Sequence, residues 1–317
     1  MCPKKRFRMS AYLQELCCYS GTITVYDEAH ELIKKMLAVE VTAKQIERVT
    51  KYVGEQIDKQ ESKAIEDAAP VGRLGTEGHR TYVMMDGSMV LTREEKWCEM
   101  KLGRLYSEDA KLELSKGRRW IRHSQYVSHL GGHHRFLEKM DHYVHEQKNR
   151  VFITDGARWI CDWVKATYPE DIHILDFFHA SEHLHDFAKV AITDEKKRRQ
   201  WCAQQTKKLL HDGVQRVIGA LKTVPCATAT MKESQRLIVG YFTNNSGSMM
   251  YGSYQAQGLQ IGSGAMESSH RTVIQKRMKL SGQRWSRRGA EYVAQLRCCY
   301  LSDQWSQVVS TISTAFL

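Results

Sequence analysis

The sequence predicts an α/β fold with one mixed sheet, a helical region before the sheet and a mostly helical stretch after its last predicted strand. Short apolar runs begin at residue 81, and several of them are followed by an aspartate, which indicates buried strands that end at a polar edge. Between the later runs, apolar residues spaced three and four apart predict amphipathic helices. The predicted order is three strands, then helix, strand, helix, strand and helix.

Residues 1–78 are predicted to form a helical region and a linker. Tyr26 to Ala38 has apolar residues at helical spacing, and Thr42 with Gln45 forms the pattern of a capping box. The helix that follows is expected to place on one face Ile46, Val49, Val53 and Ile57. Helix, short turn and helix fit a DNA-binding helix-turn-helix, and a plain helical hairpin fits at least as well. The polar segment 61–79, with one proline and three glycines, is the predicted linker.

The first three strands are predicted from short apolar or alternating segments. Tyr82 to Met85 has a buried-strand pattern that ends at Asp86-Gly87. Trp97 to Tyr106 alternates and predicts a second strand, and Trp120 to Val127 predicts a third. An antiparallel meander is the expected arrangement.

The following segments predict β-α-β units. A helix is expected to begin after Gly131-Gly132, with its apolar face toward the sheet. The next elements are a strand over Val151–Thr154 that ends at Asp155, a helix over Arg158–Thr167, and a strand over Ile172–Leu175 that ends at Asp176. A meander followed by β-α-β units is the order of the ribonuclease H-like core, a mixed five-stranded sheet with flanking helices.

The last third of the chain is predicted to be mostly helical. Residues 180–245 contain no convincing strand, and Asn244 to Gly258 has the composition of a long polar loop. Ser263 to Glu267 is expected to begin a last long helix, with a tail to Leu317. The expected domains are the helical region and linker at 1–78, two parts of the core at 79–180 and 259–317, and the helical insertion at 181–258.

The charge pattern predicts binding to a polyanion, most commonly nucleic acid. The formal net charge is +11. From Ile261 to Ala290 the only acidic residue is Glu267, and the cations are Arg271, Lys276, Arg277, Lys279, Arg284, Arg287 and Arg288. Lys196–Arg199 is a second basic run, and Lys4–Arg6 with Arg8 is a third. A single charge run is usually a solvated face, so only the segment around Glu267 is assigned to DNA.

The composition argues against a membrane protein and against a zinc ribbon. The longest apolar runs are far too short to cross a bilayer, and no apolar signal core follows Met1. The nine cysteines include no C-x-x-C and are expected to be reduced and mostly buried. We expect a protein of the cytoplasm, associated with the nucleoid through DNA.

Three acidic residues stand out by their position. Asp86 and Asp155 each end a predicted strand, and Glu267 lies in the first turns of the late helix. Sites in open α/β sheets form at the carboxyl ends of strands. Phosphodiester chemistry needs hard oxygen ligands for two Mg²⁺ ions about 4 Å apart. We therefore expect the three carboxylates to converge on two Mg²⁺ ions, with Mn²⁺ as a substitute. Taken alone, each Asp-Gly pair is more often an ordinary turn.

The sequence also resembles the Kra-type insertion-sequence transposases, over roughly residues 20–300. The resemblance lies in three catalytic segments. They are Met85–Ser88 with Trp97–Gly103, then Ile153–Ile160 with Tyr168-Pro169 and Ile174–Leu184, then Ile261–Glu267 with Lys276–Lys279 and Gly282–Trp285. In addition, Asp176-x-x-His179 is similar to a motif of Mutator-like DDE transposases.

The resemblance implies a DDE transposase that cleaves the ends of an insertion sequence and joins them to target DNA. It implies that Asp86 bridges both metal ions, that Asp155 binds one and Glu267 the other, and that Asp176 and His179 are accessory. It also implies a helical insertion between the second and third acids. We expect a homodimer or a higher oligomer on DNA.

Several alternatives stay open. One is a ribonuclease H-like nuclease that only hydrolyses DNA. Another is a truncated, DNA-binding remnant, because such transposases generally carry a longer amino-terminal region. A third and remote one is a zinc protease, because His179 to His183 fits H-x-x-E-H. Asp176 and His179 are as readily structural residues at a helix start.

Aromatic residues offer a further choice. Trp285, Tyr251 and Tyr254 fit stacking on unpaired bases, and for Trp285 core packing is equally expected.

Overall fold

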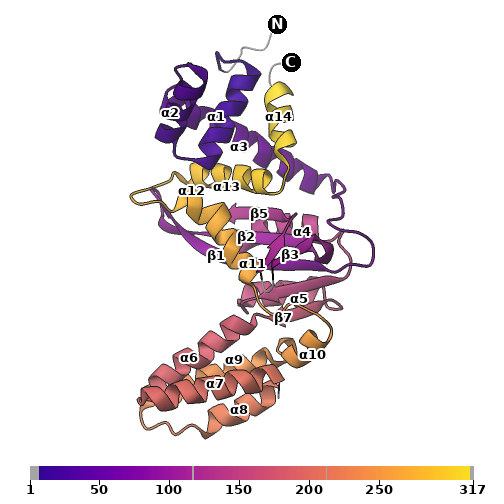
Figure 1. Cartoon of the computed structure of the whole chain (residues 1–317), viewed down its shortest axis with the longest axis vertical. Coiled ribbons are helices and arrows are strands. Elements are labelled where there is room, and N and C mark those ends of the chain that lie inside the picture. The colour runs from indigo at the N-terminus through magenta and orange to yellow at the C-terminus, as the bar shows by residue number, and fades with distance from the viewer. Residues whose placement is uncertain (1–6, 116–117, 212, 315–317) are drawn as a thin grey trace. The chain divides into compact units, whose positions relative to one another are not determined.

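The computed structural model describes residues 7–115, 118–211 and 213–314, and it divides the chain into two compact units. The first unit comprises residues 1–150 and 265–317, and the second comprises residues 151–264. Figure 1 labels the elements of both. Among the described residues, no helix is both long enough and apolar enough to span a membrane.

A mixed five-stranded sheet has the strand order β5-β2-β1-β6-β7, which confirms the predicted α/β class. β1 is antiparallel to β2, β2 is antiparallel to β5, and β6 is parallel to β7. The strands span Thr81–Thr92 (β1), Lys96–Ser107 (β2), Gln125–Leu130 (β5), Arg150–Thr154 (β6) and Ile172–Leu175 (β7). Asp155 and Asp176 directly follow β6 and β7, as predicted.

The expected end of β1 at Asp86 is wrong. Asp86 pairs with Leu102 and Gly87 with Lys101, so the strand continues through the Asp-Gly pair. Gly87 does not make a turn. A Cβ at this position would lie 2.0 Å from Oε1 of Glu99, so a larger residue would displace the Glu99 carboxylate. The long partner strand β2 keeps the backbone of β1 paired well beyond the first apolar run.

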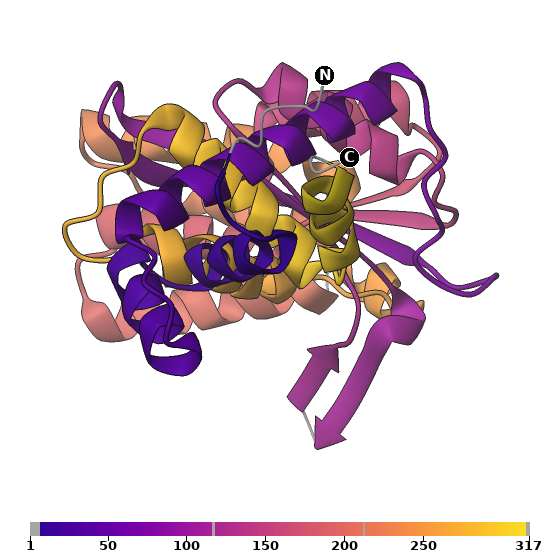
Figure 2. The same ribbon diagram turned by 90° about the horizontal axis from the view of Figure 1, so that it is seen from above.

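The third strand of the sheet is present, but the bounds expected for it, Trp120–Val127, are wrong. This segment divides into β4 (Arg118–Ile121) and β5, and β4 pairs with β3 (Lys111–Ser115) in a separate two-stranded sheet. Figure 2 shows this hairpin extending away from the rest of its unit. Trp120 is 52% exposed. Its apolar side chain therefore does not mark a buried strand.

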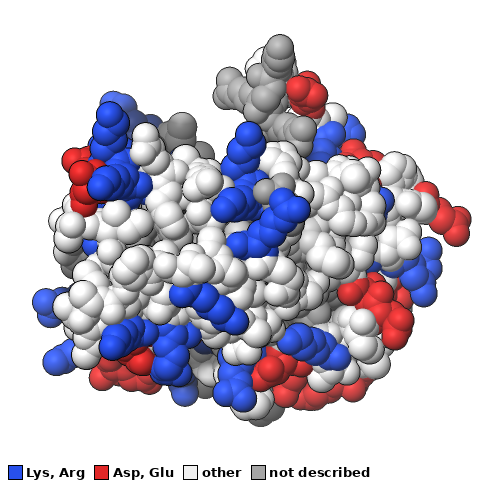
Figure 3. Space-filling view, turned by 90° about the horizontal axis from the view of Figure 1, so that it is seen from below, with Lys and Arg blue, Asp and Glu red and all other residues white. Residues whose placement is uncertain are grey.

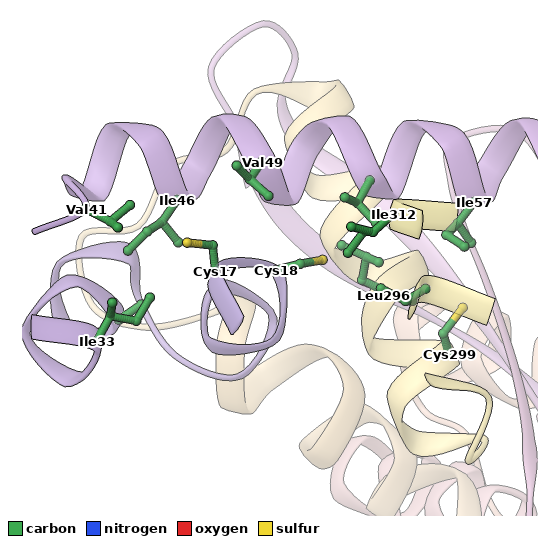
Figure 4. Close-up of a cluster of buried hydrophobic side chains, with 13 residues drawn as sticks. Cys17, Cys18, Ile33, Val41, Ile46, Val49, Ile57, Leu296, Cys299 and Ile312 are labelled. Carbon is green, nitrogen blue, oxygen red and sulfur yellow. The ribbon is translucent and has the colours of Figure 1, made fainter. Parts of the chain in front are cut away.

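The amino-terminal helices share a core with the carboxyl-terminal ones. α1 (Ala11–Ile23), α2 (Tyr26–Leu37) and α3 (Ala43–Glu66) pack with α13 (Arg287–Leu301) and α14 (Trp305–Thr314). Figure 4 shows Ile46, Val49 and Ile57 of α3 beside side chains of α1, α13 and α14. The expected tail is thus two packed helices.

The start of α3 confirms the capping box. The Gln45 N–H donates to Oγ1 of Thr42 over 3.3 Å, and the Thr42 N–H donates to Oε1 of Gln45 over 2.9 Å. The four residues predicted for the apolar face of this helix are all buried. The helix continues to Glu66, so the linker begins later than predicted.

A buried ion-pair network joins α4 (His133–Val144) to α3 and α13. α4 begins after Gly132, as predicted. Nζ of Lys139 lies 2.8 Å from Glu61, 2.9 Å from Asp58 and 3.8 Å from Glu291. Burial alone would lower the pKa of Lys139, but attraction to Glu61, Glu291 and Asp58 outweighs it and raises that pKa. The ammonium stays charged because its partners replace the lost water.

The second unit contains β6, β7 and the predicted helical insertion. Its helices are α5 (Arg158–Thr167), α6 (Phe177–Ala191), α7 (Glu195–His211), α8 (Val214–Thr223), α9 (Ala229–Asn244) and α10 (Tyr251–Ala256). The expected polar loop at Asn244–Gly258 is wrong, because it contains a 3₁₀ turn at Ser246–Ser248 and α10. Met249, Tyr251 and Tyr254 are buried, and their burial holds the segment in place.

The predicted late helix is present but is not uniform. α11 (Gly264–Ser269) leads into a π-helical segment at His270–Gln275 and then into α12 (Lys276–Met278). The cysteines agree with the prediction of reduced thiols. Those that the structure describes are all free, and apart from the half-buried Cys226 they are buried.

Candidate active site

In the first unit, the carboxylate of Asp86 is held at both of its oxygens. The Gly87 N–H donates to Oδ1 over 2.6 Å, and Oδ2 lies 3.1 Å from Nε2 of His270. The side chain is 44% exposed. Asp86 is therefore oriented by the protein and still offers oxygen lone pairs to solvent, which suits a hard divalent cation.

His270, the partner of Asp86, was not predicted from the sequence. It is 6% exposed and begins the π-helical segment. Within the described residues, neither ring nitrogen has a well-aligned hydrogen bond, although the contact with Asp86 is close. The sequence feature that could have indicated His270 is its position one helical turn after Glu267. π-Helical segments occur frequently at functional sites.

Glu267 lies in the first turn of α11, and its side chain is exposed. The buried Arg104 of β2 binds the first turns of this helix. Nη1 of Arg104 donates to the Ala265 carbonyl over 2.8 Å and contacts Oγ of Ser269 at 3.3 Å. The sequence thus places an accessible carboxylate on a helix that is fixed to the sheet of its own unit.

Four of the predicted DNA-binding cations are exposed in the way the prediction requires. They are Arg271, Lys276, Arg284 and Arg288. Lys279 is exposed too, and its Nζ donates to Oγ of Ser88 on β1. Burial lowers the pKa of Lys279, and the charge of Asp86 partly offsets this. A cation therefore lies near the Asp86 carboxylate.

The assignment of Arg277 to DNA is wrong, because its side chain is 1% exposed. Nε donates to the Gly21 carbonyl over 3.1 Å, and the guanidinium carbon lies 4.9 Å from the ring centres of both Tyr26 and Trp285. Arg277 is a core residue that joins α1 and α2 to the late helix. Periodicity alone does not reveal this, because the basic residues around it are exposed.

Arg287 is only partly available. Nη1 lies 2.6 Å from Glu95, and Nη2 donates to the Leu130 carbonyl over 3.1 Å. These contacts fix the start of α13 to the sheet. Among the predicted DNA contacts, Arg287 is thus the one that already has an acidic partner in the described structure.

In the second unit, Asp155 follows β6 at a turn that requires glycine. Gly156 has a φ of +90°, and a Cβ there would lie 2.6 Å from Cδ1 of Leu175. Oδ1 of Asp155 accepts from the Ala157 N–H over 2.8 Å. Burial, and then the negative charge of Asp155, raises the pKa of Tyr241. The half-buried carboxylate is thus oriented by the start of α5.

Asp176 has a different environment, because it is 4% exposed and accepts hydrogen bonds at both oxygens. Oδ1 accepts from the N–H groups of Phe178 and His179, and Oδ2 accepts from the N–H and the hydroxyl of Ser263. These contacts explain Asp176 as the cap of α6 without any ligand.

His179 lies in the first turn of α6, and its side chain is 39% exposed. Its ring centre is 4.8 Å from that of His183, and Nδ1 is 3.6 Å from Glu182. Burial lowers the pKa of His183, and the neighbouring His179 contributes to that shift. Within the described ranges, no three His, Cys, Asp or Glu side chains are gathered as a metal-binding group.

The expected stacking of aromatic residues on unpaired bases is not supported. Tyr251, Tyr254 and Trp285 are all buried, and Nε1 of Trp285 donates to the Met278 carbonyl over 3.0 Å. Core packing accounts for all three.

The surface shows where the remaining cations lie. Figure 3 shows many exposed Lys and Arg side chains on one face of the molecule. The basic run Lys196–Arg199 is largely exposed, and Arg199 lies 2.5 Å from Glu195. The run Lys4–Arg6 lies outside the described residues.

No protein-family model matches this sequence, and no curated protein has significant similarity to it.

Proposed function

We propose that the chain is a metal-dependent enzyme of the DDE transposase type, with a ribonuclease H-like core. The main observation in support is that two acidic residues lie on or directly after neighbouring strands of the five-stranded sheet. Asp86 lies on β1 and Asp155 directly after β6, and these strands are neighbours in the order β5-β2-β1-β6-β7. Three antiparallel strands followed by a parallel β-α-β unit are compatible with a ribonuclease H-like core and support the proposal.

The helical segment gives independent support. α6 to α10 separate β7 from α11, which carries Glu267. A transposase of the type that the sequence resembles has a helical insertion at this place, between the second and third acids. A zinc protease explains neither this arrangement nor the exposed cations after Glu267.

The proposal assigns Asp86, Asp155 and Glu267 to one catalytic set that holds two Mg²⁺ ions. The bound ions would supply a more acidic attacking water or hydroxyl and charge for the leaving oxygen. The exposed Arg271 and Lys276 would neutralise phosphates next to the scissile bond. The partners would be the element ends and target DNA, with two or more copies of the chain on them, in the cytoplasm or nucleoid.

Two products distinguish this proposal from its alternatives. Purified protein is incubated with labelled DNA from the flanks of its own locus and a target plasmid, with and without Mg²⁺. Joined product that requires Mg²⁺ supports a transposase. Cleavage without joined product would instead indicate a nuclease. Binding without any cleavage would overturn the proposed activity and leave a DNA-binding remnant.

A further inference from the structure

His270 is buried although its imidazole lacks a well-aligned hydrogen bond among the described residues. Within the described residues Nδ1 of His270 has no partner at all, and a buried polar atom of this kind costs about 1–3 kcal/mol, so a folded protein seldom keeps one without a reason. A leucine or methionine would fill the same space without this cost. The imidazole therefore has a use that packing does not explain.

The geometry indicates what that use is. Nε2 of His270 lies 3.1 Å from Oδ2 of Asp86, while Oδ1 is held by the Gly87 N–H at 2.6 Å. Contacts at both oxygens restrict rotation of the carboxylate, and the side chain stays 44% exposed to solvent. Contacts of this kind are often poorly aligned in the free protein and become aligned when the site is loaded.

The π-helical segment holds His270 in this position. The buried Arg297 of α13 donates through Nε to the Val273 carbonyl over 2.5 Å, and through Nη2 to the Thr272 carbonyl. Its Nη1 donates to the Thr22 carbonyl of α1 over 2.8 Å. Two backbone carbonyls of this segment are thus bound by a side chain from the core. The irregular turn is therefore a built feature of the fold.

We propose that His270 is a positioning residue for Asp86, which sets the orientation of the carboxylate toward a divalent cation. This inference rests on the proposed function. Residues that orient a metal ligand typically contribute 10–100-fold to metal affinity. Loss of the imidazole N–H should therefore weaken cation binding by about that factor, while the fold stays intact.

The test measures Mn²⁺ binding to the full chain by electron paramagnetic resonance, without DNA. His270→Met keeps the volume but has no donor, and we expect it to bind Mn²⁺ about 10–100-fold more weakly. His270→Gln places an amide N–H near the position of Nε2, and it should recover most of this loss. A merely structural role predicts no such difference between the two variants. Thermal unfolding of each variant shows whether it is folded.

His129→Met is the matched control. His129 lies in the same unit, and its Nδ1 is 3.0 Å from Glu291, a carboxylate outside the proposed set. This variant should keep wild-type Mn²⁺ affinity.

The two proposals fail in different ways. If Asp86→Asn weakens Mn²⁺ binding but both His270 variants bind like the wild type, the role of His270 is overturned and the metal site stands. If the wild type does not bind Mn²⁺, or if Asp86→Asn binds it equally well, the metal site itself is overturned, and the role of His270 falls with it.

Discussion

The N–H of Ser263 donates to Oδ2 of Asp176 over 2.8 Å, although the two residues are 87 positions apart in the chain. The Phe177 N–H also donates to the Ile261 carbonyl, over 2.9 Å. The two ends of the helical insertion therefore lie next to each other, and Asp176 joins them by hydrogen bonds.

Replacing Asp176 should lower stability before it affects chemistry. Asp176→Ala removes the cap of α6 and the acceptor of Ser263, and we expect it to lower the free energy of unfolding by about 2–4 kcal/mol. Urea unfolding of the full chain measures this change. If stability is unchanged while DNA cleavage is lost, Asp176 belongs to the catalytic residues instead.

Removing the buried ammonium of Lys139 should strongly lower the free energy of unfolding. Lys139→Met leaves the mostly buried carboxylates of Glu61 and Glu291 without their cation, at a cost of about 3–5 kcal/mol. Lys59→Met is the control, because Lys59 pairs with Glu55 on an exposed surface and should cost under about 1 kcal/mol. Equal losses in the two variants would contradict the importance of the buried network.

Stability should fall in mild acid because of His173. Burial, and then repulsion from Lys165, lowers the pKa of His173 to about 4. In the unfolded chain the pKa is near 6.5, so the unfolded state binds the proton first as the pH falls below that value. The fold therefore keeps its full stability at neutral pH, where His173 is neutral in both states, and loses part of that stability between about pH 6.5 and pH 4.

The measurement compares wild type with His173→Gln in urea at pH 7 and pH 5. The wild type should lose about 2 kcal/mol more than the variant over this interval. An equal loss in both proteins would show that His173 is protonated freely in the folded state. The Thr154 hydroxyl, 2.8 Å from Nε2 of His173, offers the glutamine a polar partner as well.

DNA affinity should depend on the exposed cations after Glu267 and not on Arg277. Each phosphate contact contributes a log-log salt slope of about −0.9, so Arg271→Ala with Lys276→Ala should flatten the slope by up to about two units. Arg277→Met should lower stability and leave the slope unchanged, because the side chain is buried. An unchanged slope in the double variant would remove this helix from the DNA interface.

Much of the fold follows from local chemistry. The capping box of Thr42 and Gln45, the bounds of α5, and the turn at Gly156 each depend on a few neighbouring residues. Short-range patterns predict such features well because the interactions that determine them are local. The same holds for β7, which is flanked by a turn and by the cap of α6.

The features that the sequence did not predict depend on contacts between segments that are distant in the chain. The continuation of β1 through Asp86 depends on pairing with β2, and the burial of Arg277 depends on Gly21, Tyr26 and Trp285. His270 acquires its environment from Asp86, far away in the sequence. No periodicity encodes these contacts. A charge run therefore does not distinguish cations that reach a ligand from cations that are buried, such as Arg277.

The most direct test of the catalytic assignment is DNA cleavage by Asp155→Asn, which keeps the shape of the side chain but removes its charge. Asp162→Asn is the control, because Asp162 lies on an exposed face of α5 with Arg158 3.5 Å away. We predict that Asp155→Asn abolishes Mg²⁺-dependent cleavage and leaves DNA affinity nearly unchanged, since cations dominate binding, while Asp162→Asn cleaves normally. Undiminished Mg²⁺-dependent cleavage by Asp155→Asn would contradict the account.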